Sequence, residues 1–161
     1  MADRLRCLCA AVLMAAALPL QAADGAVPPA EPQALNRFLQ AGTYKSWPRE
    51  SAPHPSRGPH PVTVLTYLNP AMQASLAAGR KDHPAGSAIV KELFDDQGAI
   101  RGWAVSIKTG AKSRLGKGWY WYEVLSPAAD AKPDYAGQGL LLCSACHATG
   151  KDYVLSDFPL K

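Results

Sequence analysis

Cysteine is scarce in this sequence, and so are long apolar runs and clusters of one charge. Two of the four cysteines, Cys7 and Cys9, lie in the first segment, so the rest of the chain has too few thiolates for an ordinary zinc site. No later apolar run approaches the roughly 20 residues of a membrane span. The net charge of +4 comes without a run of lysines or arginines, which argues against nucleic acid and weakly for an acidic partner.

Residues 1–22 have the features of a secretory signal peptide. Arg4 and Arg6 form a basic start, an alanine-rich apolar stretch covers Leu8 to Leu18, and small residues precede Ala23. We therefore expect cleavage near position 22/23 and a periplasmic protein without a membrane span. Residues 23–161 are long enough for one domain with one core.

The most specific pattern is Cys143-Ser-Ala-Cys-His147. Cys-x-x-Cys-His is the attachment signature of c-type haem: two thiols on one helical turn form thioethers, and the histidine binds the iron. A thioredoxin-like redox pair is the alternative, but it would follow a strand in a βαβ pattern. The sequence therefore predicts one covalent haem c on Cys143 and Cys146, with His147 as the iron ligand.

The remaining pattern predicts a mainly β protein of the α+β class, an antiparallel sheet with short helices and a C-terminal haem-binding helix. Three or four strands are expected. The expected strands are 62–68, 87–94, 100–109 and 119–125, and the expected helices are 31–40, 70–78 and 138–149. The segment 51–61, rich in proline, is expected to be a loop.

No residue stands out as a sixth iron ligand. Met72 is the only methionine after the signal segment, and a packing role is favoured for it over ligation. His54, His60 and His83 each adjoin proline, which is typical of surface loops. We therefore expect five-coordinate iron with an open distal side, which suits small-ligand chemistry better than electron transfer alone.

Lys91 lies in an apolar strand. The alternation of side chains places Lys91 on the face of Ile89 and Leu93, and Glu92 on the opposite face, so one of the two charges must accompany an apolar face. A lysine whose aliphatic chain is buried and whose amine reaches water is one interpretation. The other is a desolvated amine beside the haem, where a lowered pKa would make it a nucleophile.

Several segments together resemble the cytochrome P-460 and cytochrome c-prime-beta family over nearly all of the mature chain. They are Tyr44-Lys-Ser-Trp47, Tyr67-Leu-Asn-Pro70, Gly86-Ser-Ala-Ile-Val-Lys-Glu-Leu93, Gly118-Trp119, Cys143-Ser-Ala-Cys-His147 and Asp152-Tyr-Val-Leu-Ser156. The resemblance implies a periplasmic homodimer of mainly β structure. The sheet edges and the aromatic strand 119–122 are expected to contribute to its interface.

The two branches of that family imply different functions. In the P-460 branch, which oxidises hydroxylamine and handles nitric oxide, a lysine bonds to a haem meso carbon, and Lys91 matches it. Such an enzyme would need a redox partner. The c-prime-beta branch lacks this bond and binds NO or CO. Some hydroxylamine-oxidising members carry a pocket carboxylate where this chain has Ala104, a role that Glu123 or Asp95 could take. An electron carrier with Met72 as sixth ligand is the third alternative.

Overall fold

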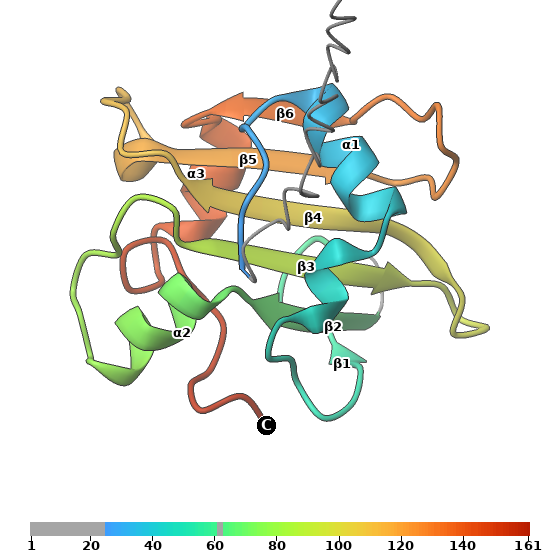
Figure 1. The fold of residues 1–161 in the computed structure, drawn as a ribbon, viewed down its shortest axis with the longest axis horizontal. Coiled ribbons are helices and arrows are strands. Elements are labelled where there is room, and N and C mark those ends of the chain that lie inside the picture. The colour runs from blue at the N-terminus through green and yellow to red at the C-terminus, as the bar shows by residue number, and fades with distance from the viewer. Residues whose placement is uncertain (1–24, 61–62) are drawn as a thin grey trace, which may run out of the picture.

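A six-stranded antiparallel sheet forms the centre of the molecule. The computed structural model describes residues 25–60 and 63–161, so the expected signal peptide, with Cys7 and Cys9, lies outside the described residues. The strands follow one another across the sheet in chain order, β1-β2-β3-β4-β5-β6. Each pairs antiparallel with its neighbour, as in a meander, and helix α2 lies in the connection between β2 and β3 (Figure 1).

Three short α-helices and two 3-10 turns accompany the sheet. The strands are β1 His54–Pro55, β2 Thr63–Leu68, β3 Ala88–Phe94, β4 Ile100–Lys108, β5 Trp119–Val124 and β6 Tyr135–Gln138. The helices are α1 Pro32–Gln40, α2 Pro70–Ala77 and α3 Leu141–His147, with 3-10 turns η1 Thr43–Ser46 and η2 Gly116–Gly118. Helices α1 and α2 both begin with proline, whose fixed φ suits the first turn of a helix and whose missing N–H costs nothing there.

One face of the sheet is covered by α1 and η1, which lie in front of the strands in Figure 1. Leu35 and Leu39 of α1 are four residues apart and so lie on one side of the helix. They pack into a cluster of side chains from η1 and strands β2 to β5. This is the larger of the two apolar clusters, and it anchors the sheet from that side.

The opposite face carries a second apolar cluster beneath α2 and α3. Its buried members are Leu68, Met72, Ile89, Trp119, Trp121 and Val154, with Leu140 and Cys143 partly buried against it. Helix α3 lies behind the strands in Figure 1. The sheet is therefore covered on both faces, and this is why the central strands lack a simple alternation of buried and exposed residues.

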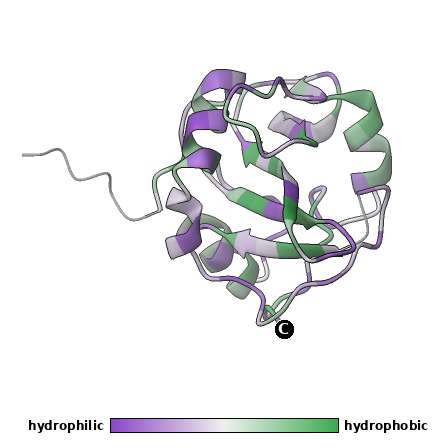
Figure 2. Cartoon of the chain, turned by 90° about the vertical axis from the view of Figure 1, so that its right-hand side faces the viewer, coloured by the Kyte–Doolittle hydropathy of each residue, from purple (hydrophilic) through white to green (hydrophobic). Residues whose placement is uncertain are grey.

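The paired positions on β3 confirm the alternation expected for Lys91 and Glu92. Glu92 faces the α1 side, where its carboxylate accepts hydrogen bonds from Tyr44 at 2.7 Å and Tyr67 at 3.1 Å. Lys91 points to the other face of the sheet. Both charged residues therefore lie on covered faces, whereas the sequence required this of only one of them. In Figure 2 the strands at the centre carry hydrophobic segments interrupted by hydrophilic ones, as this pattern requires.

The expected α+β, mainly β architecture is confirmed, with differences at its edges. The sheet has six strands, whereas three or four were expected. The short edge strands β1 and β6 are the ones that the sequence did not predict. Strand β6 occupies the start of the segment assigned to the last helix, since Gly139 takes a left-handed φ of 57° and separates the strand from α3. Residues 119–122 are at most 9% exposed, because β5 is an inner strand, so they cannot form the exposed patch expected at an interface.

Among residues 25–60 and 63–161, no helix has both the length and the apolar character needed to cross a membrane.

Candidate functional site

Helix α3 presents the cysteines and the histidine of the expected attachment motif. Cys143 and Cys146 are both free thiols, three positions apart and so about one helical turn from each other. Ser144, between them, is 4% exposed and lies on the side of the helix that faces the rest of the molecule. Gly116 makes this contact possible: a Cβ there would lie 2.8 Å from Ser144 Oγ and 3.4 Å from Trp121 Nε1. The helix therefore lies close to strand β5, with Cys143 half-buried and Cys146 exposed.

His147 ends the helix and is oriented by two neighbours. Its Nδ1 lies 2.8 Å from the carbonyl oxygen of Tyr153, so Nδ1 carries the proton and Nε2 is left as a lone-pair donor. Its ring centroid lies 4.6 Å from that of Trp121. Burial lowers the pKa of His147, and the hydrogen bond to the Tyr153 carbonyl partly opposes this effect. A neutral, oriented imidazole with a free Nε2 is what iron ligation requires.

A row of three strand residues faces the same side of the sheet as α3. Lys91 on β3 pairs with Ala104 on β4, which pairs in turn with Glu123 on β5. Directly paired residues of antiparallel strands point to one face. All three are half-buried, whereas most of their strand neighbours are buried. The row thus marks a part of the sheet that the protein's own side chains leave incompletely covered.

The ammonium group of Lys91 has neither a hydrogen bond nor an ion pair within the described residues. Burial lowers the pKa of Lys91; the charge of Glu50 opposes this effect and that of Arg57 adds to it. A lysine that reaches water along its chain keeps its ordinary pKa, so the lowered pKa favours the interpretation of a desolvated amine. An amine of this kind is neutral more often and therefore more nucleophilic.

His60 lies next to His147, which the sequence did not indicate. The two ring centroids are 6.4 Å apart. His60 Nδ1 lies 3.0 Å from Glu123 Oε2, within ion-pair distance, although the atoms are not aligned for a hydrogen bond. The expectation that His60 is a surface residue is therefore wrong: its side chain is 17% exposed, because its loop folds over the sheet.

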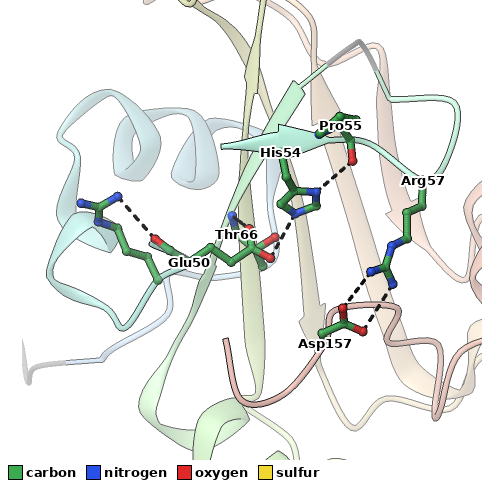
Figure 3. Close-up of polar contacts among 7 residues, drawn as sticks. Glu50, His54, Pro55, Arg57, Thr66 and Asp157 are labelled. Carbon is green, nitrogen blue, oxygen red and sulfur yellow. Dashed lines mark hydrogen bonds and ion pairs between the residues drawn. The ribbon is translucent and has the colours of Figure 1, made fainter. Parts of the chain in front are cut away.

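Two polar contacts hold that loop in place (Figure 3). Arg57 makes a bidentate pair with Asp157 of the C-terminal segment, at 2.8 and 3.3 Å. His54 Nε2 lies 3.1 Å from a carboxylate oxygen of Glu50, whose other oxygen accepts the backbone N–H of Thr66 at 2.7 Å. The loop is thus tied to strand β2 at one end and to the C-terminal segment at the other, and His60 follows directly.

The other residues considered as ligands have structural surroundings. Met72 is fully buried in the second apolar cluster, in line with the packing role expected for it. His54 is half-buried, whereas His83 is 3% exposed and its Nδ1 lies 2.8 Å from Ser75 Oγ. The expectation of a surface position is thus wrong for His83 as well. Asp95 accepts two backbone N–H groups of its own turn, so it serves that turn.

The donor set fits haem c better than a thiol redox pair. Burial raises the pKa of Cys143 to about 11, so the thiol is protonated at neutral pH, whereas thiol–disulfide exchange needs a thiolate. No group of three or more His, Cys, Asp or Glu side chains in the described part of the chain is placed to hold a metal ion. Two thiols on one helical turn, one half-buried and one exposed, together with an oriented imidazole and an incompletely covered sheet face, match the needs of a covalently attached haem.

Sequence reasoning identified the motif and Lys91 but missed three neighbours. Trp121 and Tyr153 orient His147 through aromatic contact and a backbone carbonyl, and neither interaction leaves a sequence signal. His60 could have been singled out only by its distance from His147 in space. No family model matches the chain, and no curated protein matches it.

Proposed function

We propose that the chain is a periplasmic mono-haem c-type cytochrome similar to the cytochrome P-460 and c-prime-beta proteins. Cys143 and Cys146 would form the thioethers and His147 would ligate the iron. The haem would supply redox chemistry at an open coordination position, and hydroxylamine, nitric oxide and carbon monoxide are ligands of suitable size. We expect oxidation of hydroxylamine or turnover of nitric oxide, with electrons passed to a redox partner, and a homodimer.

The observation that carries this proposal is Lys91. It is half-buried, lacks a partner in the described residues, and shares a sheet face with Glu123 close to His147. Leaving an amine half-buried without a partner costs free energy, and a haem bound beside Lys91 would account for its placement. If the amine bonded to a haem meso carbon, an N–H and a C–H would be replaced by an N–C bond, and a peroxide would take up the two electrons and two protons.

A base near the reacting ligand would assist proton removal from hydroxylamine. Ala104 cannot act as that base, and Asp95 is committed to its turn. Glu123 is the carboxylate of the row, and it lies against His60. It is therefore the candidate proton acceptor, one strand beyond the position used by some relatives.

The alternative is a cytochrome that binds NO or CO without turnover. Ala104 favours this gas-binding alternative, because its apolar side chain cannot accept a proton and Glu123 is then the one carboxylate of the row that can. An electron carrier with Met72 as ligand has less support, since Met72 is fully buried in an apolar cluster.

An intact mass and an optical spectrum of protein exported from a host with haem-attachment machinery test the proposal. We expect one added haem and, in the reduced protein, a broad and strongly red-shifted Soret band. Lys91→Arg should restore an ordinary c-type spectrum, because arginine stays protonated. Lys45→Arg is the matched control, since Lys45 lies on the opposite face beside Glu92. An ordinary Soret band in the native protein would leave the gas-binding alternative, and a chain without haem would refute both.

A further inference from the structure

Lys108 and Asp152 form the most completely buried ion pair of the described residues. Lys108 Nζ lies 2.8 and 3.0 Å from the two carboxylate oxygens of Asp152, and the side chains are 10% and 0% exposed. The ammonium also lies 5.4 Å from the ring centroid of Trp119, a distance at which the aromatic face attracts a cation. The backbone N–H of His83 donates to the same carboxylate at 2.8 Å.

A buried ion pair is by itself weak evidence for stability, because desolvation offsets its attraction. Its position in the chain suggests a different role. Asp152 precedes Tyr153, whose carbonyl oxygen accepts the Nδ1 hydrogen bond of His147. Lys108 belongs to the ladder of β4, where its N–H donates to Ser87 and its carbonyl accepts from Gly86. The pair therefore connects a rigid strand to the segment that orients His147.

That segment has an unfavourable backbone conformation. Asp152 and Tyr153 have φ values of 47° and 67°, in the left-handed region that costs a residue with a side chain about 1 kcal/mol or more. Two consecutive residues of this kind persist only where surrounding contacts hold them. The conformation turns the chain sharply after α3, so that the Tyr153 carbonyl points back at His147.

We propose that the Lys108–Asp152 pair is a positioning device for the iron ligand. By holding Asp152 in its left-handed conformation, the pair fixes the Tyr153 carbonyl at hydrogen-bond distance from His147 Nδ1. That bond keeps the proton on Nδ1, aims Nε2, and makes the imidazole a stronger electron donor. Neither Lys108 nor Asp152 contacts the side chains of Cys143, Cys146 or His147, so the pair acts on His147 only through Tyr153. This inference rests on the proposed haem ligation by His147.

The test compares haem-loaded native protein with the double variant Lys108→Met, Asp152→Asn, which removes both charges together and keeps an acceptor for the His83 N–H. Resonance Raman of the reduced protein measures the iron–histidine stretch, and a redox titration measures the potential. We expect the variant's stretch to shift to lower frequency and broaden, and its potential to become more positive, with haem still attached to Cys143 and Cys146. Lys108→Arg keeps the positive charge and should keep the native band.

The matched control is the double variant Lys117→Met, Asp82→Asn, which removes an exposed pair whose atoms lie 4.0 Å apart, and it should keep the native band. An unchanged stretch and potential in the Lys108/Asp152 variant would overturn the inference while haem ligation by His147 stands. Native protein without haem would instead overturn the proposed function. If the double variant does not accumulate, Asp152→Asn alone decides: a smaller downshift supports the inference, and an unchanged band overturns it.

Discussion

Lys91 and Ala104 are directly paired across strands β3 and β4, so an amine and a small methyl side chain lie side by side on the face of the sheet that carries α3. The pairing explains how a substitution at position 104 can act on chemistry beside Lys91. Directly opposed side chains have Cβ atoms about 5 Å apart, and the next residue in the row is Glu123. Position 104 is thus flanked by the amine of Lys91 on one side and the carboxylate of Glu123 on the other.

Ala104→Glu is therefore expected to accelerate hydroxylamine oxidation. Repulsion from Glu123 would raise the pKa of the new carboxyl and suit it to a general base, and the expected gain is roughly ten- to a hundredfold in turnover. Ala104→Gln is the control, because it has nearly the same shape and cannot accept a proton. Steady-state oxidation with an artificial electron acceptor measures both. Equal rates in the two variants would show that space, and not a base, limits the reaction.

Met72→Ala is expected to leave the resting spectrum of the haem-loaded protein that of five-coordinate, high-spin iron. The same variant should lower the free energy of unfolding by about 2–5 kcal/mol, the usual cost of removing a buried methionine side chain. Met72→Leu preserves the volume and should cost less than about 1.5 kcal/mol. Optical spectra and urea unfolding separate the two effects. A native low-spin spectrum that becomes high-spin in Met72→Ala would identify Met72 as a ligand and favour the electron carrier.

The sequence predicted the long elements well because local signals and tertiary packing agree there. Helix α1 and strands β2 to β5 lie close to the expected residues, and the alternation around Lys91 holds. The short strands β1 and β6 could not be anticipated, since two to four residues carry no periodicity and form only because a neighbouring strand offers its edge. His60 shows the same limit at the site: proline on both sides indicates a loop but not that the loop folds inward.

The core network around Glu92 makes stability depend on pH in alkaline solution. Burial and the Glu92 carboxylate raise the pKa of Tyr67 to about 12, against about 10 in the unfolded chain. Because the folded state holds this proton more tightly, the stabilisation is complete below pH 10 and is lost as the pH rises through about 12. The pKa of Tyr44 is raised too, by burial first and then by its bond to Glu92.

We therefore expect the free energy of unfolding to fall by up to about 2 kcal/mol per raised tyrosine across this range. Tyr67→Phe should make the free energy of unfolding fall less steeply with pH, because the tyrosine that titrates is gone. The variant also loses one hydrogen bond to Glu92, so its stability at neutral pH should be lower than that of the native protein. Urea unfolding at several values between pH 8 and 12 provides the measurement. A Tyr67→Phe variant that declines as steeply as the native protein would show that other groups control alkaline unfolding.

Gly102 is the glycine that the sheet can least replace. It lies opposite Leu93, where the register between β3 and β4 shifts by one residue, and a Cβ at this position would overlap the carbonyl oxygen of Val124 on β5. Glycine inside a strand often marks such a close backbone approach or a bulge. The overlap is with backbone, so it cannot be relieved by rotating a side chain, and the strand pair β4–β5 would have to separate.

Gly102→Ala should accordingly destabilise the protein by about 2 kcal/mol or more, in the range of other overpacking substitutions. Gly58→Ala is a matched control, because no atom lies within 4 Å of a Cβ built there, and its effect should stay within about 0.5 kcal/mol. Since β4 and β5 carry Ala104 and Glu123, separating them should also disturb the row beside Lys91. A folded Gly102→Ala protein with native stability would mean that the two strands do not approach as closely as described.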